Sequence, residues 1–111
     1  IRNLLDIAVN ESGSNAYSSR IMKNDWRMAG KTGTSQVKEI TAEERNQEVI
    51  ISKNWEERDH ALFVGYAPTK KPKYAVSIVI EHGGSGSQKA APLGRDILLA
   101  CQNIKGSRYR V

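Results

Sequence analysis

Residues 29–37 read Ala29-Gly30-Lys31-Thr32-Gly33-Thr34-Ser35-Gln36-Val37, which sets one lysine and three hydroxyl side chains around two glycines. In an extended strand, side chains alternate between the two faces. One face would then carry Lys31, Gly33 and Ser35, and the other Thr32, Thr34 and Gln36. A glycine inside a strand often marks a place where a ligand or another backbone comes close. We therefore expect a strand that offers a cation, hydroxyl donors and free backbone N–H groups along one edge.

These groups suit a substrate that carries a carboxylate and a carbonyl. A cation and hydroxyl donors bind the carboxylate through charge-assisted hydrogen bonds. Backbone N–H groups stabilise the oxyanion that forms when the carbonyl carbon is attacked. The stretch therefore favours acyl transfer, and it is the candidate active-site wall of this chain.

Lys31-Thr32-Gly33 is also the third motif of the penicillin-binding proteins and serine β-lactamases. The neighbouring stretches fit as well: Met28 to Val37, then Arg58-Asp59-His60-Ala61-Leu62-Phe63-Val64-Gly65-Tyr66-Ala67-Pro68, then Tyr74 to Gly84. In this order and spacing they resemble the C-terminal end of the penicillin-binding protein 2 family, the class B transpeptidases of cell elongation. The resemblance covers nearly the whole chain.

The length of 111 residues leaves room for one small domain or for part of one. The net charge of +5 would permit binding to nucleic acid or to an anionic surface, but the positive residues are spread out. We expect the tighter groups, Lys70-Lys71-Lys73 and Lys105-Arg108-Arg110, to be solvated surface. The single cysteine, Cys101, excludes an internal disulfide and is expected in the core.

Apolar spacing predicts a short helix over residues 1–10 and a second from Leu93 to Ile104, with a stripe of Leu93, Ile97, Ala100, Cys101 and Ile104. Two β-rich runs, 61–66 and 74–81, flank a proline-containing turn and predict a hairpin. In the second run, alternation places Tyr74, Val76, Ile78 and Ile80 on one face. Paired with the Lys31 strand, the hairpin predicts an α+β fold with an antiparallel sheet of at least three strands.

The resemblance adds to this fold. It implies that the chain, residues 1–111, is the C-terminal portion of a transpeptidase domain, with the N- and C-terminal helices packed on one face of the sheet. The opposite face would then be uncovered in this chain. Because the chain begins at Ile1, we expect a piece of a longer protein whose membrane anchor lies elsewhere.

Residues 38–58 are highly charged and lack periodicity, which predicts a mobile insertion between two strands. The stretch from His82 to Ser87 is rich in glycine and serine, and we expect a flexible link there. One cysteine and two histidines make a zinc site improbable, so we expect structural roles for His60 and His82. His60 would orient the entry of its strand.

Two departures from the family pattern limit what this chain does alone. No Ser-x-x-Lys nucleophile motif precedes the Lys31 strand: Ser19 to Lys23 is one residue too long, and Ser35 to Lys38 follows the third motif. The second motif, Ser-x-Asn, occurs only as Ser52-Lys53-Asn54, also after the third. Without a nucleophile and its base, acylation by the covalent route cannot proceed. We therefore expect one wall of an active site rather than a complete enzyme.

The resemblance implies a role for each residue of the wall. Lys31 and Thr34 would be catalytic, and the substrate would be bound by Thr32, Gly33, Thr34 and Ser35. The backbone N–H of Thr34 would be one of two oxyanion donors. The parent would be a peptidoglycan D,D-transpeptidase that needs neither cofactor nor metal, binds stem peptides ending in D-Ala-D-Ala and β-lactams, and works with elongation-machinery proteins at the periplasmic face of the inner membrane.

Two other functions stay open at this point. A D,D-carboxypeptidase or a serine β-lactamase would carry the same third motif. A basic nucleic-acid-binding module would use the scattered lysines, but it needs aromatic and basic residues on one sheet face, which the alternation here does not supply.

Overall fold

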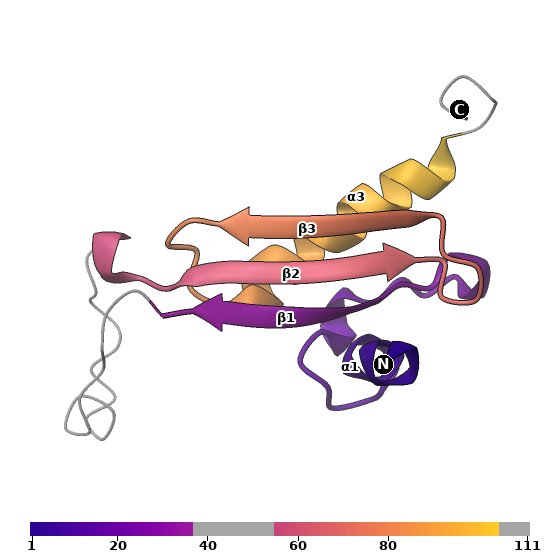
Figure 1. Ribbon diagram of the computed structural model, residues 1–111, viewed down its shortest axis with the longest axis horizontal. Helices are drawn as coiled ribbons and strands as arrows, with labels where there is room; N and C mark the ends of the chain where they lie inside the picture. The colour runs from indigo at the N-terminus through magenta and orange to yellow at the C-terminus, as the bar shows by residue number, and fades with distance from the viewer. Residues whose placement is uncertain (37–54, 105–111) are drawn as a thin grey trace.

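The computed structural model describes residues 1–36 and 55–104. In chain order these form α1 (Arg2–Asn10), two 3-10 turns, η1 (Tyr17–Ser19) and η2 (Asn24–Trp26), β1 (Ala29–Ser35), a third turn η4 (Trp55–Glu57), β2 (His60–Ala67), β3 (Tyr74–Ile80), a π-helical turn η5 (Gly86–Ala90) and α3 (Ala91–Asn103). The predicted α+β fold is confirmed: three antiparallel strands form one sheet, with helices from both ends of the chain beside it (Figure 1).

The sheet has the order β1-β2-β3, so β2 is central and β1 is an outer strand. Lys31 lies opposite Val64, and Val64 lies opposite Ser77, which fixes the register across all three strands. The predicted hairpin is confirmed, with β2 and β3 each within a residue or so of the expected bounds.

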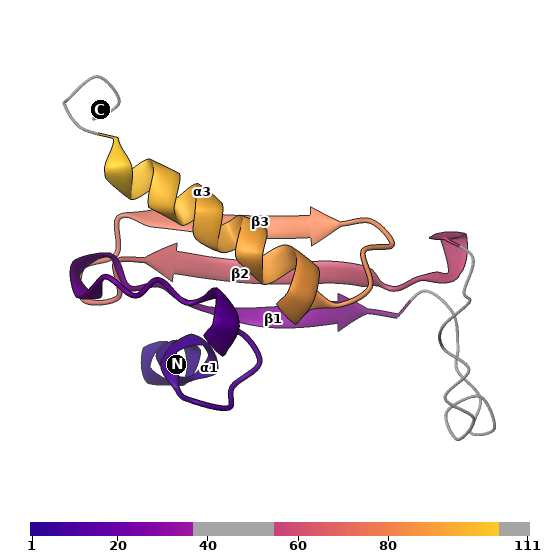
Figure 2. The same ribbon diagram turned by 180° about the vertical axis from the view of Figure 1, so that it is seen from behind.

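The core lies on the face of the sheet that α3 crosses (Figure 2). On β2, burial alternates, and the buried positions are Ala61, Phe63, Gly65 and Ala67. The largest fully buried side chains are Phe63, Met28, Leu98 and Val9. Because Val9 belongs to α1 and Leu98 to α3, both helices contribute to the same core, as the resemblance implies.

Phe63 is the only phenylalanine of the chain, and its ring is enclosed by three glycines. A Cβ atom added to Gly30 of β1 would lie 2.7 Å from the ring, and one added to Gly65 of β2 would lie 2.6 Å from it. A Cβ atom added to Gly94 of α3 would also collide with the ring. The absence of side chains at these three positions makes the space into which the ring packs.

The apolar stripe predicted for the second helix is wrong. The buried residues of α3 are Ala91, Gly94 and Leu98, and Cys101 is half-buried. Leu93, Ile97 and Ala100 are exposed, as is Ile104 directly after the helix. The helix approaches the sheet through its small residues because Gly94 leaves room for the Phe63 ring. Packing geometry has therefore selected a different face from the one with most apolar residues.

The opposite face of the sheet is open in this chain, as expected. Val64 of β2 is 52% exposed and Val79 of β3 is 63% exposed. A shallow hollow of about 430 Å³ lies there, between Leu5 of α1 and the strand residues Val64, Tyr66, Ala75 and Ser77. Apolar residues thus line both faces of the hairpin, but this chain buries only one of them.

The stretch from His82 to Ser87 is not simply a flexible link. Its last two residues begin η5, and the Ser85 hydroxyl accepts a hydrogen bond from the Gln88 backbone N–H at 3.2 Å. Gly86 is buried. Part of the stretch predicted to be flexible is therefore a capped helical turn packed on the sheet.

The insertion predicted over residues 38–58 stays a prediction. Residues 38–54 lie outside the described residues, as does the basic tail from Lys105 onward. Of the insertion, the structure describes only its end, where Trp55–Glu57 form η4 ahead of β2.

Candidate active site

β1 places the predicted site residues as the alternation requires. Lys31, Gly33 and Ser35 lie opposite Val64, Leu62 and His60, so they share the open face of the sheet. Thr32 and Thr34 lie opposite Phe63 and Ala61, so they share the face that carries the core. Because β1 is an outer strand, residues of both faces border one free edge.

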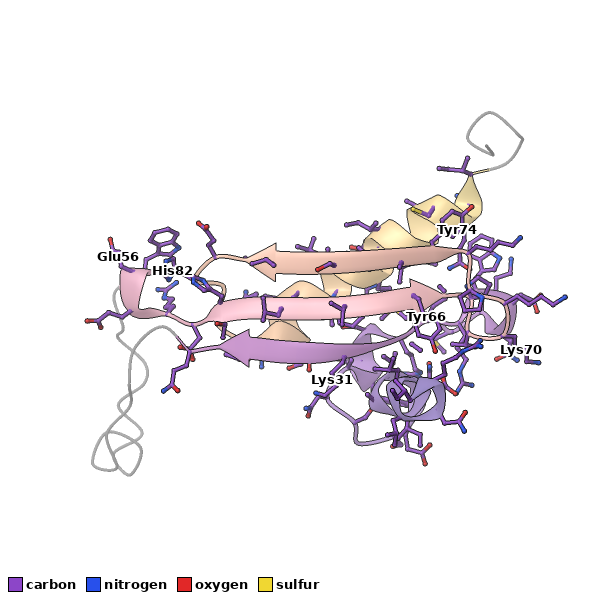
Figure 3. All side chains as sticks on the ribbon, viewed as in Figure 1. Lys31, Glu56, Tyr66, Lys70, Tyr74 and His82 are labelled. Atoms are coloured by element: carbon purple, nitrogen blue, oxygen red, sulfur yellow. The ribbon has the colours of Figure 1, made fainter. Side chains whose placement is uncertain are left out.

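The free edge of β1 carries the groups that acyl transfer needs. Lys31, Thr34 and Ser35 are exposed, and Thr32 and Gly33 are half-buried. The Lys31 ammonium donates a hydrogen bond to the Thr32 carbonyl oxygen at 3.0 Å, and the side chain projects from the strand away from β2 (Figure 3). No described strand pairs with this edge, so beyond the buried residues Ala29 and Gly30 the backbone N–H groups that point away from β2 have no strand partner.

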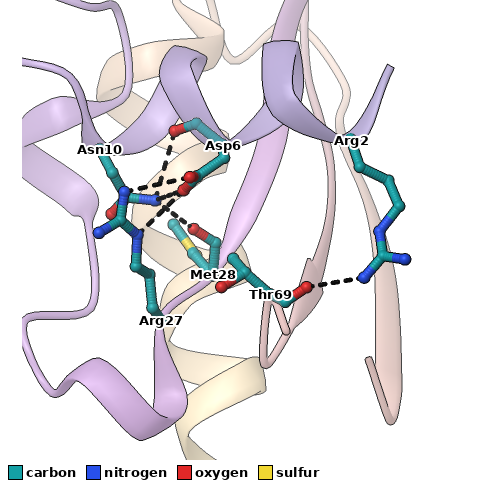
Figure 4. Close-up of polar contacts among 6 residues, drawn as sticks. All are labelled: Arg2, Asp6, Asn10, Arg27, Met28 and Thr69. Carbon is teal, nitrogen blue, oxygen red and sulfur yellow. Dashed lines mark hydrogen bonds and ion pairs between the residues drawn. The ribbon is translucent and has the colours of Figure 1, made fainter. Parts of the chain in front are cut away.

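The N-terminal end of β1 is fixed by α1 (Figure 4). The Asn10 amide donates hydrogen bonds to the carbonyl oxygen of Met28, the residue before β1, and to the Asp6 carboxylate, both at 2.7 Å. Asp6 in turn accepts two hydrogen bonds from the Arg27 guanidinium, at 3.0 and 3.1 Å. The sequence analysis assigns Asn10 only to the end of a helix, and its contact with Met28 is a tertiary feature with no local signal.

The turn between β2 and β3 supports the same end of the site strand. The Thr69 backbone N–H donates a hydrogen bond to the Arg27 carbonyl oxygen at 3.0 Å. The Arg2 guanidinium donates to the Thr69 carbonyl oxygen at 2.9 Å (Figure 4). Two segments distant in sequence, α1 and the β2–β3 turn, therefore converge on the start of β1.

The two histidines meet near the other end of the sheet, and their contacts are structural, as expected. The His82 backbone N–H donates to His60 Nδ1 at 2.9 Å, so His60 holds no proton on Nδ1. His82 Nδ1 lies 2.8 Å from the Arg58 carbonyl oxygen, and its ring centroid is 4.3 Å from that of Trp55. These contacts tie the entry of β2 to the segment after β3, a pairing that the sequence does not reveal.

A second, larger hollow does not coincide with the predicted site. It has a volume of about 920 Å³ and is lined by Arg2, Asn3, Asp6, Asn24, Asp25, Arg27, Tyr66, Pro68, Thr69, Lys70, Lys71 and Lys73. These residues surround the N-terminal end of β1 and the β2–β3 turn, away from Thr34 and Ser35. Within residues 1–36 and 55–104, no group of three or more His, Cys, Asp and Glu side chains is placed to hold a metal ion. The same residues contain no helix long and apolar enough to span a bilayer.

Comparison with curated proteins finds relatives that share most of this chain. The chain is 37% identical to the peptidoglycan D,D-transpeptidase MrdA of Haemophilus influenzae over 91 residues, which is 82% of the chain and 13% of that protein. It is 45% identical to the MrdA of Acinetobacter baumannii over 71 residues, which is 61% of the chain and 10% of that protein. The chain therefore spans only a small part of the relatives that it matches.

Solved structures similar to this chain come from the same group of proteins. Penicillin-binding protein 2 of Pseudomonas aeruginosa, in complex with WCK 5153, superposes with a TM-score of 0.67 at 28% identity, over 96% of this chain and 21% of that one. Penicillin-binding protein 2 of Helicobacter pylori, in complex with MreC, gives a TM-score of 0.66 at 28% identity, over 93% of this chain and 17% of that one. The penicillin-binding protein transpeptidase domain family matches residues 1–99. With the Lys31 strand at the free edge of the sheet, this match over most of the chain shows that the protein belongs to the penicillin-binding protein transpeptidase family.

Proposed function

We propose that this chain forms the Lys-Thr-Gly wall of a peptidoglycan D,D-transpeptidase that cross-links stem peptides ending in D-Ala-D-Ala. The observation that carries the proposal is the free edge of β1, where Lys31, Thr32 and Thr34 border open backbone N–H groups. The relatives that match most of the chain bear the name peptidoglycan D,D-transpeptidase. The serine nucleophile and its lysine come from outside this chain, because no Ser-x-x-Lys precedes β1.

Each residue of the wall has a role in the proposed mechanism. The Lys31 ammonium attracts the terminal carboxylate of the substrate and holds the serine of the second motif by a hydrogen bond. The hydroxyls of Thr32 and Thr34 donate to the same carboxylate. The Thr34 backbone N–H stabilises the oxyanion together with the N–H of the nucleophile itself. Gly33 and Ser35 lie against the substrate at the strand edge, where Gly33 presents no side chain to it.

A penicillin uses the same wall, since its carboxylate and its β-lactam carbonyl need the same two sets of donors. The experiment is therefore acylation of the intact parent protein by a fluorescent penicillin. We expect Lys31→Ala to reduce the acylation rate constant roughly 10²- to 10³-fold, comparable to the loss of one oxyanion donor. Because Lys31 is exposed and buries little, the melting temperature is expected to change little.

Lys70→Ala is the matched control, because it removes the same charge from an exposed position at the far end of the sheet (Figure 3). This variant is expected to be acylated with the same rate constant as the wild type. Val76→Ala provides the opposite pattern: this half-buried residue packs against the core, so its truncation is expected to cost about 1–3 kcal/mol of unfolding free energy while folded molecules acylate normally. Full acylation by Lys31→Ala would assign the chemistry to another strand.

The proposed location is the periplasmic face of the bacterial inner membrane, where peptidoglycan is assembled. Elongation-machinery proteins are the proposed partners, since a structural relative was solved as a complex with MreC. Analysis of the reaction products on a stem-peptide donor separates this function from its alternatives. Cross-linked dimers are expected, whereas a D,D-carboxypeptidase would release D-Ala alone and a β-lactamase would leave the peptide intact.

A further inference from the structure

Gly86, the first residue of η5, packs against the backbone of the Lys-Thr-Gly segment. It is buried, and a Cβ atom built on it would lie 2.7 Å from the Leu62 carbonyl oxygen and 3.1 Å from the Gly33 nitrogen. The Gly33 carbonyl oxygen would be closer still. Real Cβ atoms do not approach backbone atoms so closely, so only glycine fits at this position.

The need for glycine here comes from space and not from backbone conformation. Among the described glycines, a left-handed φ occurs at Gly13 and Gly84, and Gly86 is not one of them. The atoms that a Cβ atom would meet are backbone atoms of β1 and β2, which no change of rotamer can move aside. Adding one methyl group must therefore shift either η5 or β1.

The segment that carries Gly86 is held from both sides. The Gly84 backbone N–H donates to the Asp59 carbonyl oxygen at 2.9 Å, which ties the segment to the residue before β2. Ser85 caps η5: its hydroxyl accepts from the Gln88 N–H, and its carbonyl oxygen accepts from the Lys89 N–H at 2.9 Å. This anchoring makes η5 a fixed support behind β1, and β1 has no second strand beside it among the described residues.

We propose that Gly86 is a positioning residue for acylation: it lets η5 press on the Gly33 backbone and so sets the position of the neighbouring Thr34 N–H. The inference rests on the proposed function, in which that N–H is an oxyanion donor. The geometry of such a donor is strict, and a misplacement of about 1 Å costs up to roughly 10²-fold in rate. Gly86 acts through its contact with the Gly33 backbone, so its role is positioning and not catalysis.

The test is Gly86→Ala in the intact parent protein, with Gly83→Ala as the matched control. Gly83 belongs to the same segment, but a Cβ atom there would meet side-chain atoms outside β1, at 2.7 Å from Ile80 Cγ2, 3.0 Å from Ile80 Cβ and 3.2 Å from Ala61 Cβ. Stopped-flow labelling with a fluorescent penicillin separates the non-covalent affinity from the acylation rate constant. The folded fraction of each variant is measured from its thermal transition, and the affinity and the rate constant are both expressed per folded molecule.

We expect Gly86→Ala to lower the acylation rate constant roughly 10- to 100-fold with a smaller change in affinity. Gly83→Ala is expected to keep an acylation rate constant within about threefold of the wild type, because the atoms that its Cβ atom meets belong to Ile80 and Ala61 and not to β1. This collision is expected to lower the folded fraction instead. Equal acylation by the two folded variants, whether both normal or both reduced, would overturn the proposal. A merely structural role for Gly86 would change the folded fraction and leave the rate constant intact.

Ser85→Ala keeps the proposal testable if Gly86→Ala does not fold. This variant removes the cap that holds η5 without adding an atom, and a fall in the acylation rate constant of roughly three- to tenfold is expected. An unchanged rate constant in Ser85→Ala, with Gly86→Ala unfolded, would refute the positioning role. Lys31→Ala separates failure of the proposed function from failure of the inference about Gly86. If Lys31→Ala is acylated at the normal rate, the proposed function fails. If Lys31→Ala is slow and Gly86→Ala is acylated at the normal rate, the inference alone fails.

Discussion

The packing of Phe63 against glycines makes a double-mutant cycle with Gly94 the sharpest test of this fold. Phe63 is fully buried, and a Cβ atom on Gly94 would lie 2.6 Å from ring atom Cε2, with a closer contact to Cδ2. In the wild type, Gly94→Ala is therefore expected to cost about 1–3 kcal/mol by overpacking. This cost exceeds the gain of about 0.8–1 kcal/mol that alanine brings over glycine inside a helix.

Phe63→Ala alone is expected to cost about 3–5 kcal/mol of unfolding free energy. The upper part of this range applies, because two of the glycines lie in strands that cannot collapse into the cavity, and glycine has no side chain to fill it. In the Phe63→Ala background the collision at Gly94 is gone, so Gly94→Ala is expected to stabilise by about 0.5–1 kcal/mol. The sign of the Gly94→Ala effect reverses between the two backgrounds.

The coupling energy of this cycle is expected to reach about 2 kcal/mol, in the range for residues in direct contact. The measurement is urea-induced unfolding of the intact transpeptidase domain, with the midpoint and slope fitted for all four proteins. Val79→Ala is the control, since that side chain is 63% exposed and its truncation is expected to change stability by less than about 0.5 kcal/mol. The packing described here would be refuted if the losses of unfolding free energy in Phe63→Ala and Gly94→Ala add up to the loss in the double variant to within about 0.5 kcal/mol.

Three further predictions concern the anchoring of β1, the missing nucleophile and the open face. Asn10→Ala is expected to lower the free energy of unfolding by about 1–2 kcal/mol, because it leaves the Met28 carbonyl oxygen without its partner. Loss of the half-exposed Asp6–Arg27 pair is expected to lower it by less than about 1 kcal/mol. Equal losses in urea-induced unfolding would contradict this order. The 111-residue chain alone is expected to gain no penicilloyl adduct by mass spectrometry, because no Ser-x-x-Lys precedes β1, and an adduct on any serine would refute that reading. The isolated chain is expected to bind a hydrophobic dye through Val64 and Val79, and a Val64→Thr/Val79→Thr variant is expected to bind less without melting earlier; a monomer that binds no dye would contradict the exposed face.

Local pattern determined much of the fold from the sequence alone. Period-two alternation grouped the residues of β3 that pack on the core onto one face, and the β-rich runs around a proline turn identified the hairpin. The same alternation separated Lys31 from Thr32 and Thr34 on the site strand, and the register confirms it. These features depend on residues next to each other in the chain, so a single sequence contains them.

Only the tertiary structure decided which backbones come close together. The glycines around Phe63 belong to three different elements, and Gly86 meets Gly33 across 53 positions of sequence. From the sequence, Gly86 belongs to a flexible link and Gly94 lies outside the apolar stripe of its helix, because periodicity measures side-chain hydrophobicity and not the distance between packed elements. A glycine chosen for close approach looks the same in a sequence as one chosen for flexibility. The difference appears only when the atoms that its missing side chain would displace are known, and these come from segments distant in the chain.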